Sequence, residues 1–134
     1  MQWDATPRAG FTSGEPWLPI AEDCGECNVQ LLQQHPRSML TFYKRLIDMR
    51  HARLALSVGT YKAVFCDQRV LAYERSHDTE RLLIALNFSD DEASAPLTGD
   101  RGTILLSTHL DREGELIQER CVLRAHEAVI ITFG

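Results

Sequence analysis

The sequence has 134 residues, of which 44% are hydrophobic and 25% are charged, and these values are those of one ordinary globular domain. Its formal net charge is -5, and no run of Lys and Arg is dense enough to bind a nucleic-acid backbone, so nucleic acid is excluded as a partner. No stretch approaches the roughly 20 apolar residues that cross a bilayer, and the first ten residues lack a secretory pattern. We therefore expect no membrane partner and a cytoplasmic location.

The first 35 residues are rich in residues that interrupt regular structure. They contain both tryptophans and three of the five prolines, and they show no sustained helix or strand period. We expect a long irregular loop, with a short helix over Val29–Gln34 that is capped by Asn28. Irregular segments of this length are normally binding loops or pieces separated from the surface that they cover.

An amphipathic helix is predicted over Pro36–Arg53. Pro36 suits the first helical turn, because its missing N–H is not needed there. Basic residues concentrate toward the C-terminal half, where the helix dipole favours cations. The apolar face of this helix is formed by Met39, Leu40, Tyr43, Leu46 and Ile47.

After the helix, short apolar runs bounded by turn residues predict an antiparallel β-sandwich. Two of these runs, Arg81–Phe88 and Ala128–Phe133, carry apolar residues on both faces, which indicates central strands. A turn is predicted at Thr98–Asp100. The six predicted strands are Gly59–Phe65, Val70–Arg75, Arg81–Phe88, Thr103–Ser107, Glu115–Leu123 and Ala128–Phe133. The order of elements indicates an α+β chain with a self-contained β domain.

The chain opens with MQWDATPRAGFTSGEPWLPI, which resembles a signature of the alpha-amylase superfamily, glycoside hydrolase family 13. The resemblance is to the branch of oligo-1,6-glucosidases, alpha-glucosidases, trehalose-phosphate hydrolases and sucrose isomerases. Its pattern is matched by Met1–Asp4, Ala9–Thr12 and Pro16–Trp17. Farther along, Phe42–Ile47 resembles the eighth barrel helix and Leu86–Ser89 resembles a strand of the C-terminal sandwich.

This resemblance implies that the chain is the C-terminal part of an alpha-glucosidase. Residues 1–53 would be the loop after the last strand and the final helix of a (β/α)8 barrel, and residues 54–134 would be a Greek-key-type antiparallel β-sandwich. In this family an aspartate nucleophile, a glutamate acid/base and a second aspartate perform retaining hydrolysis of oligosaccharides. All three motifs would lie upstream of Met1, and Asp4 lacks the Asn-His pair that precedes the second aspartate. We expect no catalytic residue in this chain, no cofactor, and no activity of the chain alone.

Gln2, Trp3 and Asp4 are candidates for the rim of the substrate pocket. In the resembled enzymes this loop lies at the active-site side of the barrel, where binding residues gather. The alternative is that the aromatic rings of Trp3, Phe11 and Trp17 anchor the loop by burying their area. The residues alone leave both interpretations open.

The segment Cys24-Gly25-Glu26-Cys27 is the only CxxC motif. It supplies two of the four ligands that a structural zinc site needs, so no metal site is expected. A redox role is typical of such a motif in a thioredoxin-like βαβ unit, and no such unit is predicted. We expect reduced thiols here and at Cys66 and Cys121.

Three functions compete. The first is the end of an alpha-glucosidase, whose partners are the missing catalytic barrel and the oligosaccharide substrate of the parent enzyme. The second is a free-standing carbohydrate-binding or interaction module, for which only Tyr61 and Tyr73 could offer sugar-stacking rings in the β region. The third is a small independent enzyme, which no motif favours. Without the barrel, we expect the apolar helix face either to self-associate or to be covered by residues 1–35.

Overall fold

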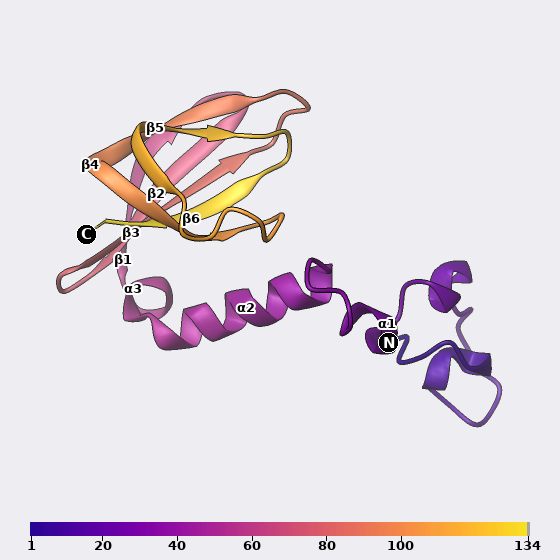
Figure 1. Ribbon diagram of the computed structural model, residues 1–134. Helices are drawn as coiled ribbons and strands as arrows, with labels where there is room; N and C mark the ends of the chain where they lie inside the picture. The colour runs from indigo at the N-terminus through magenta and orange to yellow at the C-terminus, as the bar shows by residue number, and fades with distance from the viewer. Residues whose placement is uncertain (134) are drawn as a thin grey trace. The chain divides into compact units, whose positions relative to one another are not determined.

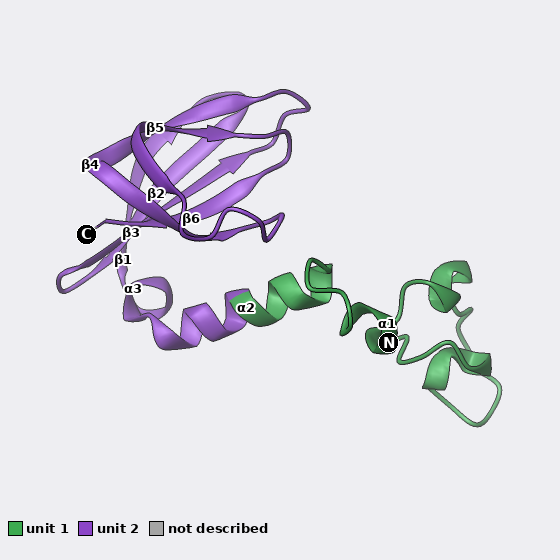
Figure 2. Cartoon of the chain, viewed as in Figure 1, with its two compact units in different colours: residues 1–45 green, residues 46–134 purple. Residues whose placement is uncertain are grey.

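The computed structural model describes residues 1–133, and the chain divides into two compact units, residues 1–45 and residues 46–134 (Figure 2). The first unit contains two 3-10 turns, η1 (Pro7–Gly10) and η2 (Glu22–Gly25), and the short helix α1 (Val29–Leu32). The helix α2 (Met39–Ala52) continues from the first unit into the second, where it is followed by α3 (Leu54–Ser57). Among the described residues, no helix combines the length and the apolar character needed to span a bilayer.

The first unit is largely irregular, as predicted, and backbone hydrogen bonds attach its first residues to α1. The N–H groups of Val29 and Gln30 donate to the carbonyls of Gln2 and Trp3, at 3.0 and 2.9 Å. Asn28 caps α1 as predicted, because its side-chain oxygen accepts the N–H of Leu31 at 3.0 Å. The helix ends at Leu32, two residues before the predicted end.

Helix α2 begins at Met39, so the prediction that Pro36 occupies its first turn is wrong. Ser38 caps the helix instead: its hydroxyl oxygen accepts the N–H of Thr41 at 3.1 Å. No residue of α2 is buried. Met39 and Tyr43 are 66% and 56% exposed, so residues 1–35 do not fold back over them, and of the two outcomes expected for the helix face the second, coverage by residues 1–35, is wrong.

Six antiparallel strands form the sheet of the second unit (Figure 1). Their order in the sheet is β1-β2-β3-β6-β4-β5, so the two strands predicted to be central are central. Strand β4 also contacts β2 and β3, with which it does not pair, because the sheet curls over its own core. This confirms the predicted antiparallel sandwich. The strands are β1 (Thr60–Cys66), β2 (Val70–His77), β3 (Glu80–Asn87), β4 (Ala93–Ser107), β5 (Leu116–Leu123) and β6 (Ala128–Thr132).

The core of the sandwich is built from side chains that alternate along the strands, because successive residues of a strand point to opposite faces. Strand β3 is buried on both faces, as its sequence predicted. Helix α3 contacts β2 and β3, and its Ala55 is fully buried. The main core cluster consists of Val70, Ala72, Leu83, Ala85, Ala93, Ala95, Ile104, Ile117, Cys121, Leu123, Val129 and Ile131.

Strand β4 contradicts two predictions: it begins ten residues before the predicted Thr103, and Thr98–Asp100 is not a turn. The chain instead continues through an irregular pairing with β5, where the register shifts between Pro96 and Arg101. On the partner strand Glu119 has a φ of 59°, a left-handed conformation typical of bulges. A bulge lets turn-forming residues stay within a strand, so local turn propensity was misleading here.

Candidate functional site

The predicted rim residues Gln2, Trp3 and Asp4 lie in the segment that is attached to α1. The side-chain amide of Gln2 donates to Asp23 Oδ1 at 3.3 Å, which links this segment to η2. Asp4 Oδ1 accepts the N–H of Thr6 at 2.9 Å and its hydroxyl at 2.5 Å. These bonds lower the pKa of the Asp4 carboxyl group, because they stabilise its charged form.

The position of the Asp4 carboxylate is one reason why residue 10 of the opening motif is a glycine. Gly10 has a φ of 63°, and a Cβ atom placed on it would lie 2.6 Å from Asp4 Oδ2. A side chain at this position would therefore meet both backbone strain and the carboxylate. The Asp4 carboxylate thus holds the turn at the start of the loop.

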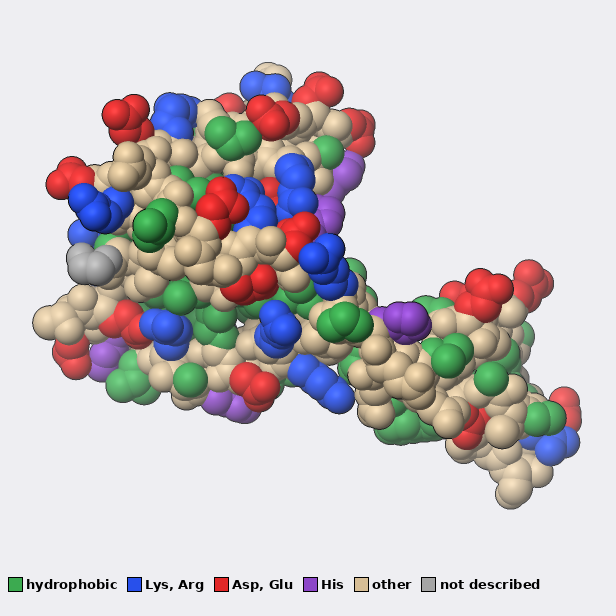
Figure 3. Space-filling view, viewed as in Figure 1, with side chains coloured by type: hydrophobic (Ala, Val, Ile, Leu, Met, Phe, Trp, Pro, Cys, Tyr) green, Lys and Arg blue, Asp and Glu red, His purple; other side chains and the backbone are tan. Residues whose placement is uncertain are grey.

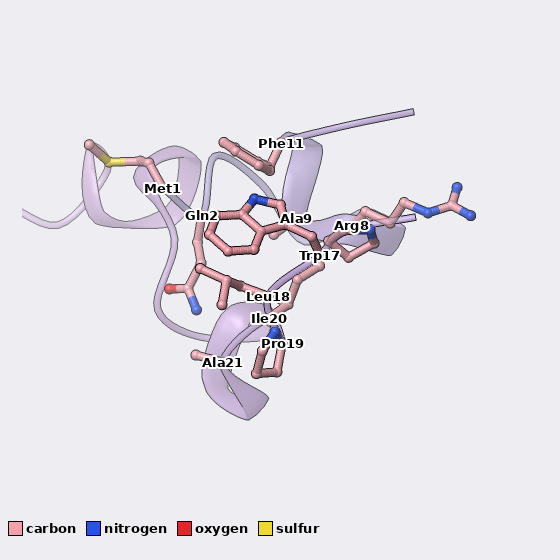
Figure 4. A pocket seen from close by; sticks show the side chains of 11 residues that line it. Met1, Gln2, Arg8, Ala9, Phe11, Trp17, Leu18, Pro19, Ile20 and Ala21 are labelled. Carbon is pink, nitrogen blue, oxygen red and sulfur yellow. The ribbon is translucent and has the colours of Figure 1, made fainter. Parts of the chain in front are cut away.

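An open pocket of about 600 Å³ lies within the first unit (Figure 4). Its lining is mainly apolar, and Gln2 is the rim candidate that contributes to it. In Figure 4 the indole of Trp17 lies across the pocket between Phe11 and Leu18, while the guanidinium of Arg8 points away. Trp17 and Phe11 are 87% and 58% exposed, so these two rings do not anchor the loop by burial.

The pocket can bind a ligand by contact with exposed rings, and its lining residues include no Asp or Glu. A glycosidase needs one carboxyl group with a raised pKa as the proton donor. Among the described residues, every Asp or Glu with a resolved shift has a lowered pKa: these are Asp4, Asp67, Glu74, Glu115 and Glu127. No group of three or more His, Cys, Asp or Glu that could hold a metal ion occurs within residues 1–133.

Sequence reasoning missed a buried ionic cluster in the second unit. The Glu127 side chain is 0% exposed. Its carboxylate accepts three hydrogen bonds: from Nη1 of Arg112 at 2.9 Å, from the backbone N–H of Arg124 at 2.9 Å and from Nη2 of Arg124 at 2.6 Å. Burial raises the pKa of Glu127, but the hydrogen bonds and charges of Arg124 and Arg112 outweigh it, so the net shift is downward. No sequence pattern marked these residues, because Arg112 comes from a different turn than Arg124 and Glu127.

The remaining contacts of this cluster satisfy both arginines. Arg112 also forms a two-point pair with Glu115 at 2.7 and 2.8 Å, and Arg124 pairs with Asp111 at 2.7 Å. Figure 3 shows acidic and basic side chains next to one another on the visible face of this unit. Because its two arginines and Glu127 are paired with one another, the cluster stabilises the turns between strands rather than forming a reactive site.

Comparison with known proteins divides the chain into two family matches. Residues 1–59 match the family described as "Alpha amylase, catalytic domain", and residues 61–130 match a "Domain of unknown function (DUF3459)". The oligo-1,6-glucosidase of Bacillus cereus is 34% identical over 134 residues, which are 97% of this chain and 24% of that protein. The oligo-1,6-glucosidase of Heyndrickxia coagulans is 35% identical over 112 residues, 83% of this chain and 20% of that protein.

The fold gives the same result. The trehalulose synthase MutB from Pseudomonas mesoacidophila MX-45 superposes with a TM-score of 0.87 at 30% identity, over 98% of this chain and 24% of that chain. The two matched parts therefore define a segment of an alpha-amylase-type enzyme, with the end of a catalytic domain followed by a β-sandwich. The chain belongs to the alpha-amylase family, glycoside hydrolase family 13, and its relatives include oligo-1,6-glucosidases. This confirms the resemblance of the opening motif.

The chain spans about a quarter of the length of the relatives that it matches. The family matches change between residues 59 and 61, and the compact units change between residues 45 and 46. The predicted division between residues 53 and 54 stays a prediction. So does the contact of Gln2, Trp3 and Asp4 with a sugar.

Proposed function

We propose that this chain is part of an alpha-glucosidase that hydrolyses terminal alpha-glucosidic bonds in oligosaccharides, and that it completes and stabilises the catalytic barrel. The observation that carries the proposal is the extent of the identity to an oligo-1,6-glucosidase, which continues through the loop, the helix and the sandwich over 97% of the chain. The catalytic carboxyl groups are then supplied from outside this chain, about 5 Å apart as retaining hydrolysis requires.

The exposed apolar side chains of the first unit support this role. Trp3, Phe11, Trp17 and Leu18 are each at least half exposed, and Met39 and Tyr43 are exposed on α2. Phe11, Trp17 and Leu18 line the same pocket, and exposed apolar surface gathered in this way marks an interaction face. The partner that we propose for it is the remainder of the catalytic domain, with Gln2, Trp3 and Asp4 at the rim of the glucose pocket.

A chimera tests the proposal. The matching region of the Bacillus cereus oligo-1,6-glucosidase is replaced by this chain, and hydrolysis of an α-1,6-linked glucose disaccharide is measured. We expect turnover by the chimera and none by the chain alone. Trp17→Ala should lower the activity of the chimera, whereas Leu116→Ala, which truncates an exposed side chain of the sandwich, should not. A folded but inactive chimera would contradict the proposal, and turnover by the isolated chain would indicate an independent enzyme.

The alternative of a free-standing carbohydrate-binding module receives little support from the tyrosine pair. Tyr61 and Tyr73 have ring centroids 5.2 Å apart at an interplanar angle of 33°. Because each ring covers part of the other, the pair offers one accessible ring, that of Tyr61, which is 58% exposed. Calorimetric titration of the isolated chain with gluco-oligosaccharides should detect no binding. Binding that Tyr61→Ala abolishes would favour the module.

We also infer that the isolated chain self-associates through the apolar face of α2. The predicted face is Met39, Leu40, Tyr43, Leu46 and Ile47. Analytical sedimentation should show oligomers for the unaltered chain and for the control Lys44→Glu, and monomers for Tyr43→Glu. A monomeric unaltered chain would contradict this inference.

We also propose the expected cytoplasmic location. Recovery of the protein outside the cytoplasmic fraction of its cells would contradict this location.

A further inference from the structure

Cys24 and Cys27 lie in one tight turn of the first unit. Cys24 belongs to η2, and the carbonyl of Asp23 accepts the N–H groups of both Glu26 and Cys27, at 2.9 and 2.7 Å. Both thiols are free, that of Cys27 is exposed and that of Cys24 is partly exposed. Small reagents can therefore reach the pair.

The spacing of the two cysteines suits an internal disulfide. Residues three apart in a helical turn have Cβ atoms about 5–6 Å apart. A disulfide needs a Cβ separation of about 3.5–4.5 Å and a Cα separation of about 4.4–6.8 Å. Closure of the turn by roughly 1–2 Å thus brings the two sulfur atoms into bonding geometry.

The other two cysteines do not offer this chemistry. Cys121 is fully buried, and burial raises the pKa of its thiol to about 11, which keeps it in the unreactive protonated form. Cys66 is exposed, but no cysteine precedes or follows it within a turn. Cys66 is therefore a matched control for an exposed thiol without a neighbour.

Hydrogen bonds connect the turn to the segment that contains the predicted rim residues Gln2 and Trp3. The Asn28 side-chain amide donates to the carbonyl of Cys24 at 2.9 Å, while its oxygen caps α1. Asp23, which closes the turn, accepts the side-chain amide of Gln2. A change in this turn therefore reaches α1, whose first N–H groups hold the carbonyls of Gln2 and Trp3.

We propose that Cys24 and Cys27 form a thiol–disulfide exchange site for a neutral or cationic low-molecular-weight disulfide, and that its oxidation tightens the attachment of Gln2 and Trp3 to α1. The charge preference follows from Glu22, Asp23 and Glu26, three carboxylates within two residues of a thiol, which repel an anionic reagent.

The exchange balances without any further reactant. The thiolate of the exposed Cys27 attacks one sulfur of the small disulfide, forms a mixed disulfide and releases one small thiolate. The thiolate of Cys24 then attacks the sulfur of Cys27, forms the Cys24–Cys27 bond and releases the second small thiolate. The two cysteine thiols lose two electrons and two protons, and the small disulfide is reduced to two thiols.

The test treats the reduced 134-residue chain with cystamine, hydroxyethyl disulfide or oxidised glutathione, which are cationic, neutral and anionic, and identifies the products by peptide mass spectrometry. We expect the peptide that contains both cysteines to lose two hydrogens in the unaltered chain and in Cys66→Ser. Cys24→Ser should instead retain the reagent on Cys27. Cystamine should react several-fold faster than oxidised glutathione at low ionic strength, and the difference should shrink in about 1 M salt, where the Debye length is about 3 Å.

The second measurement is amide hydrogen exchange at Val29 and Gln30 in the reduced and oxidised unaltered chain. We expect exchange to slow on the order of tenfold after oxidation, which is the scale of the entropy lost on closing a short loop. A stable mixed disulfide on the unaltered chain, or faster reaction with oxidised glutathione, would overturn the site. Unchanged exchange at both amides would overturn the coupling. Because both measurements use the unaltered chain, neither depends on whether a variant folds.

Discussion

Replacement of Glu127 by glutamine tests whether the buried ionic cluster stabilises the sandwich. Glu127→Gln keeps the shape of the side chain but removes its charge. The carboxylate that it replaces accepts three hydrogen bonds from Arg112 and Arg124. An amide can accept some of these bonds, but its NH2 group faces guanidinium donors, so part of the network is lost.

The structure sets the magnitude of the loss. Breaking a buried ion pair by removing one partner destabilises a protein by about 3–5 kcal/mol. Here Arg112 keeps Glu115, and Arg124 keeps Asp111 and has a side chain that is nearly half exposed, so solvent and the other carboxylates compensate part of the loss. We expect the free energy of unfolding to fall by about 2–3 kcal/mol for Glu127→Gln and by about 3–5 kcal/mol for Glu127→Ala.

Urea unfolding followed by far-ultraviolet circular dichroism measures this change. With an m-value of about 1–1.5 kcal/mol/M for a unit of this size, the midpoint should fall by roughly 2 M for Glu127→Gln. Glu92→Gln, at an exposed position, is the control and should change the free energy by less than about 0.5 kcal/mol. Equal midpoints for Glu127→Gln and the unaltered protein would refute the assigned role of the cluster.

The pH dependence gives an independent check. The pKa of Glu127 is lower in the folded protein than in the unfolded chain, so its stabilising contribution is complete above the unfolded value of about 4.3. The contribution is lost as the pH falls through the lower, folded value. The stability difference between the unaltered protein and Glu127→Gln should therefore be constant near neutrality and narrow below about pH 4. A difference that widens on acidification would contradict the direction of the shift.

Two further substitutions test the packing of the sandwich. Gly102→Ala should lower the free energy of unfolding by about 1–3 kcal/mol, because its new Cβ atom would clash with Cγ2 of the buried Ile131. The control Gly25→Ala, at a position with open space around it, should have little effect. Equal urea midpoints for the two variants would contradict the close approach of β4 and β6. Asn87→Ala should lower the free energy of unfolding by about 2–3 kcal/mol. The buried Asn87 amide donates to the carbonyls of Asp91 and Arg124 at 2.7 and 2.9 Å, and both carbonyls would lose this donor. A loss below about 0.5 kcal/mol in calorimetric unfolding would show that water replaces the amide as donor.

Part of this architecture could be predicted because it depends on local periodicity. The run Arg81–Phe88 is apolar at successive positions. A strand that is apolar on both faces must be covered on both, so the pattern alone predicted a central strand, as observed. The cap of α1 was also local, since Asn28 lies three residues before the N–H that it accepts. These features need no information from distant residues.

The errors have the opposite origin. Thr98–Asp100 has the composition of a turn, but the residues on either side of it, Pro96 and Arg101, pair with β5, and Gly99 lies against the ring of Phe133. Pro36 suits a helix start, yet Ser38 provides the better cap two residues later. In the first case residues distant along the chain decided the outcome, and in the second a competing cap nearby did.

The sequence by itself determined the family, through the motif that begins at Met1, together with α1, α2 and the presence of six strands, because these depend on residue types at short spacing. It did not predict the short helix α3. Only the tertiary structure revealed the pocket around Trp17, the burial of Glu127 between two arginines, and the link from Cys24 through Asn28 to the rim segment. Such sites join residues that are distant along the chain, and the packing that brings them together leaves no periodic trace in the sequence.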